Sequence, residues 1–215
     1  VKRRVSEGER VIGRKIGLTS RARQELLGVG EPDYGHLTDR MVVLEGEPCL
    51  GSELLQPKVE GGLAFCLAKP LKGPGRTVVD VYNATAWVAP AIEVVDSRIR
   101  DWRIKLADTV ADNGSSARLL LGACMKPIHE VDMRLIGMTL EKNGQHVNSG
   151  TGIEVLGNPA ASVAWLANKL AEYDIGLEAG HILLSGAVTA AQVAQPGDSF
   201  AVRFQGMGSV GIKFL

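Results

Sequence analysis

Two glutamates lie among apolar residues, where a carboxylate has no ordinary structural role. Glu93 is the third residue of AIEVV, and Glu60 begins the otherwise uncharged run EGGLAFCL. A buried carboxylate without a partner costs several kcal/mol or takes up a proton, so each side chain needs a cation. Separate salt bridges to lysine or arginine would satisfy both residues structurally. Alternatively, both would bind one divalent ion, because carboxylate oxygens are suitable ligands for Mg²⁺ and Mn²⁺.

Lys15 and Asp33 form a second pair of candidates. Lys15 lies in GRKIGLTS, beside an isoleucine and close to a Gly-Leu turn, and Asp33 lies in EPDYGHL. A lysine in a strand usually faces solvent, and an aspartate often stabilises a turn by accepting nearby backbone N–H groups. The functional interpretation is a lysine that contacts a substrate carboxylate or transfers a proton, and an aspartate that acts with it.

Small polar residues offer possible contacts to an anionic substrate in two further places. Asn113 and Ser115 lie in DTVADNGSS, and Ser185 and Gly186 begin SGAVTAA after an apolar stretch. These residues would either bind a substrate oxyanion or only stabilise the turns in which they lie. The four histidines show no metal-binding spacing, and only His36 lies close to another candidate.

The composition excludes several classes of function. Lys and Arg together number 24, as do Asp and Glu, so the formal net charge is zero and nothing indicates a nucleic-acid binder. No apolar run approaches the roughly 20 residues that span a bilayer, and the charged first residues do not resemble a signal peptide. The three cysteines have no CxxC spacing, which favours a reducing cytoplasm. Dinucleotide-binding, P-loop and nucleophile-elbow motifs are absent from the sequence.

The hydrophobic pattern predicts a β-rich chain of the α+β class. Strands are predicted at residues 11–18, 58–69 and 91–97, and short strands fill the last forty residues. Helices are predicted after Thr19-Ser20 as far as Gly28, from Asp80 through Trp87 with Pro90 ending it, and after Asn158-Pro159. Residues 30–40 are predicted to be a polar loop, and Asn143-Gly144 the turn of a hairpin.

Motifs along essentially the whole chain resemble one enzyme family. They are GRKIGLTS, GVGEPDYGHLTDRM, QPKVEGGLAF, LKGPG, AIEVVDSRIRDWRIKLADTVADN, EKNGQ, GNPAASVAWLAN and GSVGIKF. The resemblance is to the 2-hydroxypenta-2,4-dienoate (2-keto-4-pentenoate) hydratases of the fumarylacetoacetate hydrolase superfamily, and the 4-oxalocrotonate decarboxylases share most of the motifs. It implies a rolled mixed sheet with flanking helices, as in the C-terminal domain of fumarylacetoacetate hydrolase. Residues 1–215 are expected to form a single catalytic domain without the N-terminal helical part of the family.

The resemblance also implies a set of site residues. Family members bind Mg²⁺ or Mn²⁺ through three glutamates, of which Glu60 and Glu93 match two. The third position is occupied here by Gly62, because the usual E-x-E pattern is Glu-Gly-Gly. Lys15 and Asp33 match the active-site lysine and aspartate of the family.

The function implied is hydration of 2-hydroxypenta-2,4-dienoate to 4-hydroxy-2-oxopentanoate in the meta-cleavage catabolism of aromatic compounds. The alternatives are a 4-oxalocrotonate decarboxylase, and an impaired assembly partner in which Gly62 weakens the metal site. A hydrolase that cleaves a C–C bond is a further reading and would need His36 as a base. The expected partners are a small 2-oxo or 2-hydroxy-dienoic acid, further copies of the chain and the companion decarboxylase or hydratase, in the cytoplasm.

Overall fold

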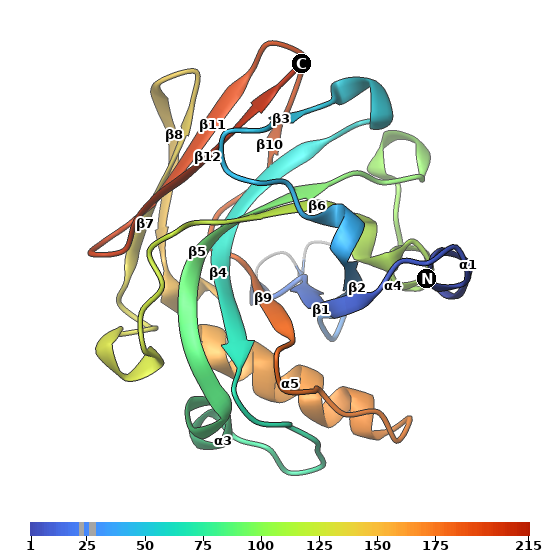
Figure 1. Cartoon of the computed structure of the whole chain (residues 1–215), viewed down its shortest axis with the longest axis vertical. Helices are drawn as coiled ribbons and strands as arrows, with labels where there is room; N and C mark the ends of the chain where they lie inside the picture. The colour runs from blue at the N-terminus through green and yellow to red at the C-terminus, as the bar shows by residue number, and fades with distance from the viewer. Residues whose placement is uncertain (22–23, 26–28) are drawn as a thin grey trace.

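The computed structural model describes residues 1–21, 24–25 and 29–215 (Figure 1). The predicted helix end at Gly28 lies outside the described residues. Within the described part of the chain, no helix combines the length and apolar character needed to cross a membrane.

The larger sheet carries all of the candidate residues that could bind an ion. Its strand order is β2-β1-β9-β4-β5-β6, with β10 paired to β4. The strands are β1 (Val11–Gly17), β2 (Asp33–Thr38), β4 (Lys58–Leu67), β5 (Thr85–Val95), β6 (Ser116–Leu121), β9 (Ile182–Ala187) and β10 (Gln192–Val193). Neighbours are antiparallel except β1 and β9, which are parallel.

This sheet curls until its two ends meet. Val42, just beyond β2, forms an isolated bridge with Leu119 of β6, and the Val43 N–H donates to the Leu119 carbonyl at 2.9 Å. The inner face of the curl is filled by small and medium apolar side chains, namely Leu37, Met41, Ala64, Ala91, Leu119 and Leu184. Their modest size allows opposite walls to approach closely and leaves the polar residues at one end of the curl.

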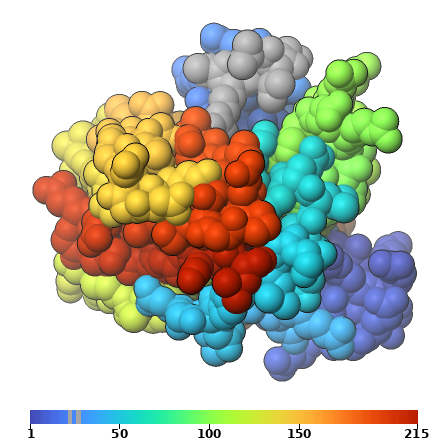
Figure 2. Space-filling view, turned by 90° about the horizontal axis from the view of Figure 1, so that it is seen from above, coloured from blue at the N-terminus to red at the C-terminus, as the bar shows by residue number. Residues whose placement is uncertain are grey.

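A second sheet packs on the outside of β4 and β5. Its order is β3-β12-β11-β7-β8, with β3 (Pro48–Cys49), β7 (Gly137–Lys142), β8 (Gln145–Thr151), β11 (Ser199–Phe204) and β12 (Gly208–Phe214). The C-terminal strands (red) lie between the β7–β8 hairpin (yellow) and the segment leading into β4 (cyan) (Figure 2). Phe200 and Phe214 pack edge to face in the core between the two sheets, with their ring centroids 5.8 Å apart.

The helices with bounds in the described part of the chain flank the larger sheet. They are α1 (Lys2–Ser6), α3 (Val78–Ala84), α4 (Leu106–Ala111) and α5 (Pro159–Ala171). Single 3-10 turns lie at Asp39–Met41, Gly51–Glu53, Arg100–Trp102, Asn113–Ser115, Ile128–Glu130 and Gly152–Glu154. Helix α5 buries Val163, Leu166 and Leu170 and lies beside α3 and β9 (Figure 1). Its N-cap Asn158 accepts the Ala160 N–H at 2.9 Å, which confirms the predicted start.

The α+β class, the strands near 11–18 and 58–69 and the C-terminal strands are confirmed. The hairpin turn is also confirmed, because Asn143 and Gly144 both have positive φ between β7 and β8.

The predicted loop at 30–40 is wrong, because Asp33–Thr38 form strand β2. Its residues alternate in direction: Asp33, Gly35 and Leu37 are buried on the inner face, whereas Tyr34 and His36 on the other face are partly exposed. Turn-forming residue types occur in this strand because its inner face lines a polar site, where apolar side chains would have no place.

The predicted helix from Asp80 through Trp87 is also wrong at both ends. Thr77 is the N-cap, Asp80 is the third helical residue of a capping box, and the helix ends at Ala84. Pro90 does not end a helix; it lies inside β5, opposite Leu63. The Pro90 carbonyl accepts the Gly122 N–H just past the end of β6, and the missing N–H lies on the same edge of β5, where β6 has already ended.

Candidate active site

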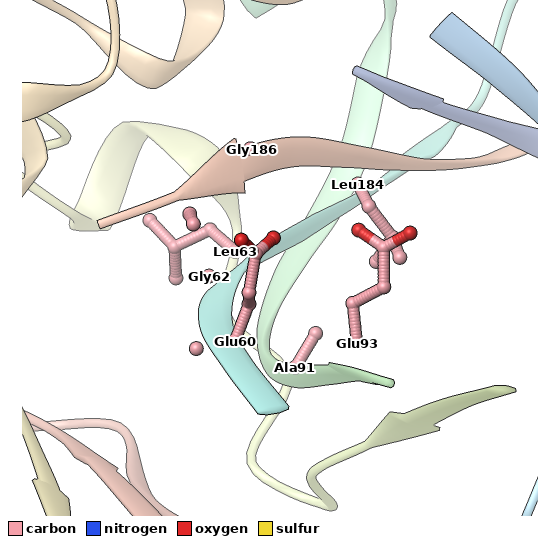
Figure 3. Close-up of a pocket in the computed structure, with 9 residues that line it drawn as sticks. Glu60, Gly62, Leu63, Ala91, Glu93, Leu184 and Gly186 are labelled. Atoms are coloured by element: carbon pink, nitrogen blue, oxygen red, sulfur yellow. The ribbon is translucent and has the colours of Figure 1, made fainter. Parts of the chain in front are cut away.

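Glu60 and Glu93 are direct partners across β4 and β5. Side chains of such pairs share one face, with Cβ atoms about 4.5–5.5 Å apart. Both carboxylates point toward β9, where Leu184 and Gly186 lie (Figure 3). Together they line a small cavity of about 10 Å³, roughly one water-sized sphere.

Glu93 has the environment of a ligand rather than of a surface acid. Its side chain is nearly buried, and Oε1 has no hydrogen-bond partner among the described atoms. Burial raises the pKa of Glu93 to about 7, although the nearby Lys15 ammonium group opposes this shift. Glu93 Oε1 lies beside an ion-sized cavity and is placed to bind a cation in addition to the Lys15 ammonium group.

Lys15 connects Glu93 to Asp33. Its Nζ lies 3.7 Å from Glu93 Oε1 and 3.7 Å from Asp33 Oδ1, and the side chain is 4% exposed. Burial alone would lower the pKa of Lys15, but the charges of Glu93, Asp33 and Glu60 outweigh burial and raise it. Lys15 is therefore an ammonium group held among carboxylates, and the solvent-exposed reading of this lysine is wrong.

Asp33 is fixed by one of its two oxygens. Oδ2 accepts a hydrogen bond from Thr109 Oγ1 at 2.5 Å, whereas buried Oδ1 has no hydrogen-bond partner among the described atoms. A side chain at Gly17 would overlap Oδ1 and displace the Asp33 carboxylate, so the glycine leaves room for this group. Sequence analysis missed Thr109: it lies in the polar stretch singled out above, but nothing in the sequence shows that its hydroxyl reaches β2.

A larger cavity of about 290 Å³ opens beside these residues. Lys15, Asp33 and Glu60 form its polar end. The remaining wall includes the apolar residues Leu18, Val95, Ile104 and Ala191, and also Trp102 with Lys58, whose Nζ lies 4.1 Å from the Trp102 ring centroid. The cavity thus has the size and mixed lining of a small-molecule site, with its charged groups at one end.

The four predicted substrate-binding residues lie in different environments. Ser115 lines the larger cavity and donates to Asp112 Oδ2 at 3.0 Å, while Gly186 lines the small cavity. The Asn113 side-chain amide makes two hydrogen bonds to the backbone of His36: its Oδ1 accepts the His36 N–H at 2.7 Å, and its Nδ2 donates to the His36 carbonyl at 2.9 Å. Ser185 is fully buried and donates to the Leu63 carbonyl at 3.0 Å. Asn113 and Ser185 thus support the walls, and only Ser115 and Gly186 reach a cavity.

His36 lies on the opposite face of the sheet from Lys15. It pairs with Arg14 across β1 and β2, whereas Lys15 pairs with Gly35. Burial and the Arg14 charge lower the pKa of His36 to about 4. A neutral histidine on the far face does not provide the base that a C–C hydrolase would need at the charged cluster.

Gly62 lies beside the two glutamates and has no space for a side chain. An ideal Cβ atom there would lie 2.5 Å from the Gly186 carbonyl oxygen. Among the described residues, no three His, Cys, Asp or Glu side chains form a metal-binding group. Two paired carboxylates, Glu60 and Glu93, are thus the donors present, and they would hold a divalent ion only with water or substrate oxygens as further ligands.

Residues 31–214 match the sequence model described as fumarylacetoacetate (FAA) hydrolase, C-terminal. The chain belongs to the fumarylacetoacetate hydrolase family. A 2-hydroxypent-2,4-dienoate hydratase from Pseudomonas putida is 51% identical over 176 residues, covering 81% of this chain and 79% of that protein. A 2-hydroxyhexa-2,4-dienoate hydratase from Comamonas testosteroni is 46% identical over 213 residues, covering 98% of this chain and 81% of that protein.

A solved structure of this family has nearly the same fold. The 4-oxalocrotonate decarboxylase from Pseudomonas putida G7, complexed with magnesium and adipate, matches with a TM-score of 0.97 and 42% identity, covering 100% of this chain and 81% of that one. The same decarboxylase is also known with calcium and acetate. These findings confirm the predicted family, the rolled-sheet fold and a lyase-type enzyme related to hydratases and decarboxylases, and they support a divalent metal as cofactor.

Proposed function

We propose that this fumarylacetoacetate hydrolase family member adds water to 2-hydroxypenta-2,4-dienoate in the meta-cleavage catabolism of aromatic compounds. The observation that carries the proposal is the buried cluster of Lys15, Asp33 and Glu93 beside Glu60, at the polar end of a cavity large enough for such an acid. The hydratases at 51% and 46% identity act on substrates of this kind, as their names state.

Glu60 and Glu93 would hold Mg²⁺ or Mn²⁺, which when bound supplies Lewis-acid polarisation of the substrate's C1 carboxylate and C2 oxygen. Lys15, held as an ammonium group by the surrounding carboxylates, places positive charge beside that oxygen and stabilises the negative charge that develops on it. A Schiff base on Lys15 is disfavoured, because an amine held in its protonated form is not a nucleophile.

The reaction would proceed in two proton-balanced stages. The enol proton leaves the C2 oxygen and a proton is added at C5, which gives a 2-oxo-3-enoate with an electrophilic C4. Water then adds across the C3–C4 double bond, its oxygen to C4 and a proton to C3, giving 4-hydroxy-2-oxopentanoate. Asp33 Oδ1, unsatisfied and next to Lys15, is positioned to orient or deprotonate that water.

Decarboxylation of 4-oxalocrotonate is the second candidate. Lys58 lines the larger cavity and offers a positive charge to a second carboxylate, which 4-oxalocrotonate carries and the dienoate lacks. The match to the decarboxylase structure favours the same reading.

Side-by-side turnover of 2-hydroxypenta-2,4-dienoate and 4-oxalocrotonate, with added Mg²⁺ or Mn²⁺, tests the proposal. A hydratase gives 4-hydroxy-2-oxopentanoate from the first and releases little CO₂ from the second. Preferential CO₂ release would instead establish the decarboxylase. No turnover of either substrate, with metal affinity at background, would overturn both enzymatic readings and leave the impaired assembly partner. Size measurement of the chain alone and with a companion enzyme tests the predicted assembly.

A further inference from the structure

Thr109 connects a short helix to the proposed catalytic aspartate. It lies in α4, and its Oγ1 donates to Asp33 Oδ2 at 2.5 Å across 76 positions of sequence. Thr109 and Asp33 are 2% and 3% exposed, so water does not readily replace this bond. Hydrogen bonds to a charged acceptor are among the stronger ones in proteins.

The bond fixes the orientation of the Asp33 carboxylate relative to the reacting groups. With Oδ2 held by Thr109, Oδ1 is the oxygen 3.7 Å from Lys15 Nζ, and it accepts no hydrogen bond from the described atoms. A half-turn of the carboxylate about its Cβ–Cγ bond gives an equivalent arrangement, but smaller rotations would place neither oxygen correctly. The Thr109 hydroxyl restricts these smaller rotations.

Hydrogen bonds at both ends of helix α4 hold the helix in place, and they therefore also fix the position of the Thr109 hydroxyl. At its start, the Lys105 N–H donates to Asp108 Oδ2 at 3.0 Å. At its end, Asp112 accepts the Arg98 backbone N–H at 3.1 Å and the Arg98 Nε at 2.5 Å. Through its hydrogen bond, Thr109 on this capped helix thus holds the Asp33 side chain on β2 in place.

We propose that Thr109 is a positioning residue, which holds Asp33 with Oδ1 directed at Lys15 and the substrate. The inference rests on the proposed function, because it takes Asp33 as the group that handles water. A misplaced catalytic group costs up to about 100-fold in rate even when binding is intact. Loss of the Thr109 hydroxyl therefore lowers kcat and leaves KM nearly unchanged.

The test compares Thr109→Val, which keeps the shape and removes the hydroxyl, with Thr109→Ser, which keeps the hydroxyl. Thr38→Val is the matched control: buried Thr38 Oγ1 also donates to a carboxylate at 2.5 Å, that of Glu9, away from both cavities. We expect kcat for 2-hydroxypenta-2,4-dienoate to fall about 10- to 100-fold in Thr109→Val, with near-parental rates in Thr109→Ser and Thr38→Val. The affinity for Mn²⁺, titrated without substrate, stays parental in all three.

Asp33→Asn separates failure of the inference from failure of the proposed function. If Asp33→Asn loses activity and Thr109→Val keeps the parental kcat, the positioning role is wrong and the function stands. If Asp33→Asn keeps the parental kcat, the role of Asp33 and with it the positioning role are wrong, while the hydratase function stands; a parent that does not turn over 2-hydroxypenta-2,4-dienoate overturns the function itself. If Thr109→Val does not fold, Thr109→Ala replaces it, and a parental kcat in that variant equally overturns the inference.

Discussion

Lys15 Nζ lies 3.7 Å from Glu93 Oε1, and both side chains are almost completely buried. This contact lets a lysine remain charged where burial alone would favour its neutral form, because the carboxylates raise its pKa. Lys15 is the only positively charged member of the cluster of Lys15, Asp33, Glu60 and Glu93, and it lies between Glu93 and Asp33.

The first prediction concerns that charge. Lys15→Met preserves much of the apolar stem and removes the ammonium group, so kcat for 2-hydroxypenta-2,4-dienoate is expected to fall by about 100-fold or more. Lys72→Met, which removes an exposed lysine paired with Asp174, is the control and keeps the parental kcat. A Lys15→Met protein that is folded and fully active would remove Lys15 from the mechanism.

The second prediction concerns pH. Burial raises the pKa of Glu93 from 4.5 to about 7, so the folded protein binds this proton more tightly than the unfolded chain. The resulting contribution to stability is complete below pH 4.5 and is lost as pH rises through about 7. Because a metal binds the ionised carboxylate, divalent-metal affinity changes in the opposite direction and increases up to about pH 7.

Thermal unfolding of the metal-free protein between pH 4.5 and 8, for the parent and Glu93→Gln, measures this effect. The difference in unfolding free energy between the two proteins should vary with pH in that window. The partly exposed Glu141, paired with Arg203, provides the Glu141→Gln control, whose difference from the parent should stay flat there. A flat difference for Glu93→Gln as well would contradict the raised pKa.

The third prediction concerns Gly62. Its missing Cβ would lie 2.5 Å from the Gly186 carbonyl, so Gly62→Ala and Gly62→Glu should both lower the thermal midpoint in the absence of metal. If this position lacks a ligand, Mn²⁺ should bind Gly62→Glu more tightly than Gly62→Ala and raise its midpoint further. Equal Mn²⁺ affinity in all three proteins, with tight binding by the parent, would mean that another group fills the third position.

The fourth prediction uses two glycines with similar backbone but different surroundings. Gly114 has φ +61°, and a Cβ there would lie 2.7 Å from Lys15 Cε; Gly144 has φ +74° with no atom within 4 Å. Each substitution to alanine should cost about 1 kcal/mol or more through the positive φ. Only Gly114→Ala should also displace Lys15 and lower kcat. Equal kcat values in the two variants would show that the Lys15 position tolerates this contact.

The site could be predicted from the sequence only in part. Glu60 and Glu93 were recognisable because a carboxylate in an apolar strand needs a partner. Their direct pairing was not, because it depends on the register of β4 and β5 across an intervening helix. Thr109 is one of many threonines in the chain, and its role depends on the contact between α4 and β2, which no local pattern encodes.

The fold shows the same division. Strands with one apolar face and turns with special backbone needs, such as Asn143-Gly144, were predicted correctly because their signals are local. Strand β2 was missed because its inner face carries Asp33 and Gly35 for the site, and these residues mimic a turn. Pro90 was misjudged because its tolerance inside β5 depends on where β6 ends.

The central claim is that Glu60 and Glu93 together hold one divalent ion on which turnover depends. Titration of the metal-free protein with Mn²⁺, alongside turnover of 2-hydroxypenta-2,4-dienoate at each Mn²⁺ concentration, tests it most directly. We predict one ion per chain, activity that follows occupancy, and loss of both in Glu60→Gln and in Glu93→Gln. Full activity in the presence of a chelator, or Mn²⁺ binding that survives both substitutions, would contradict the account.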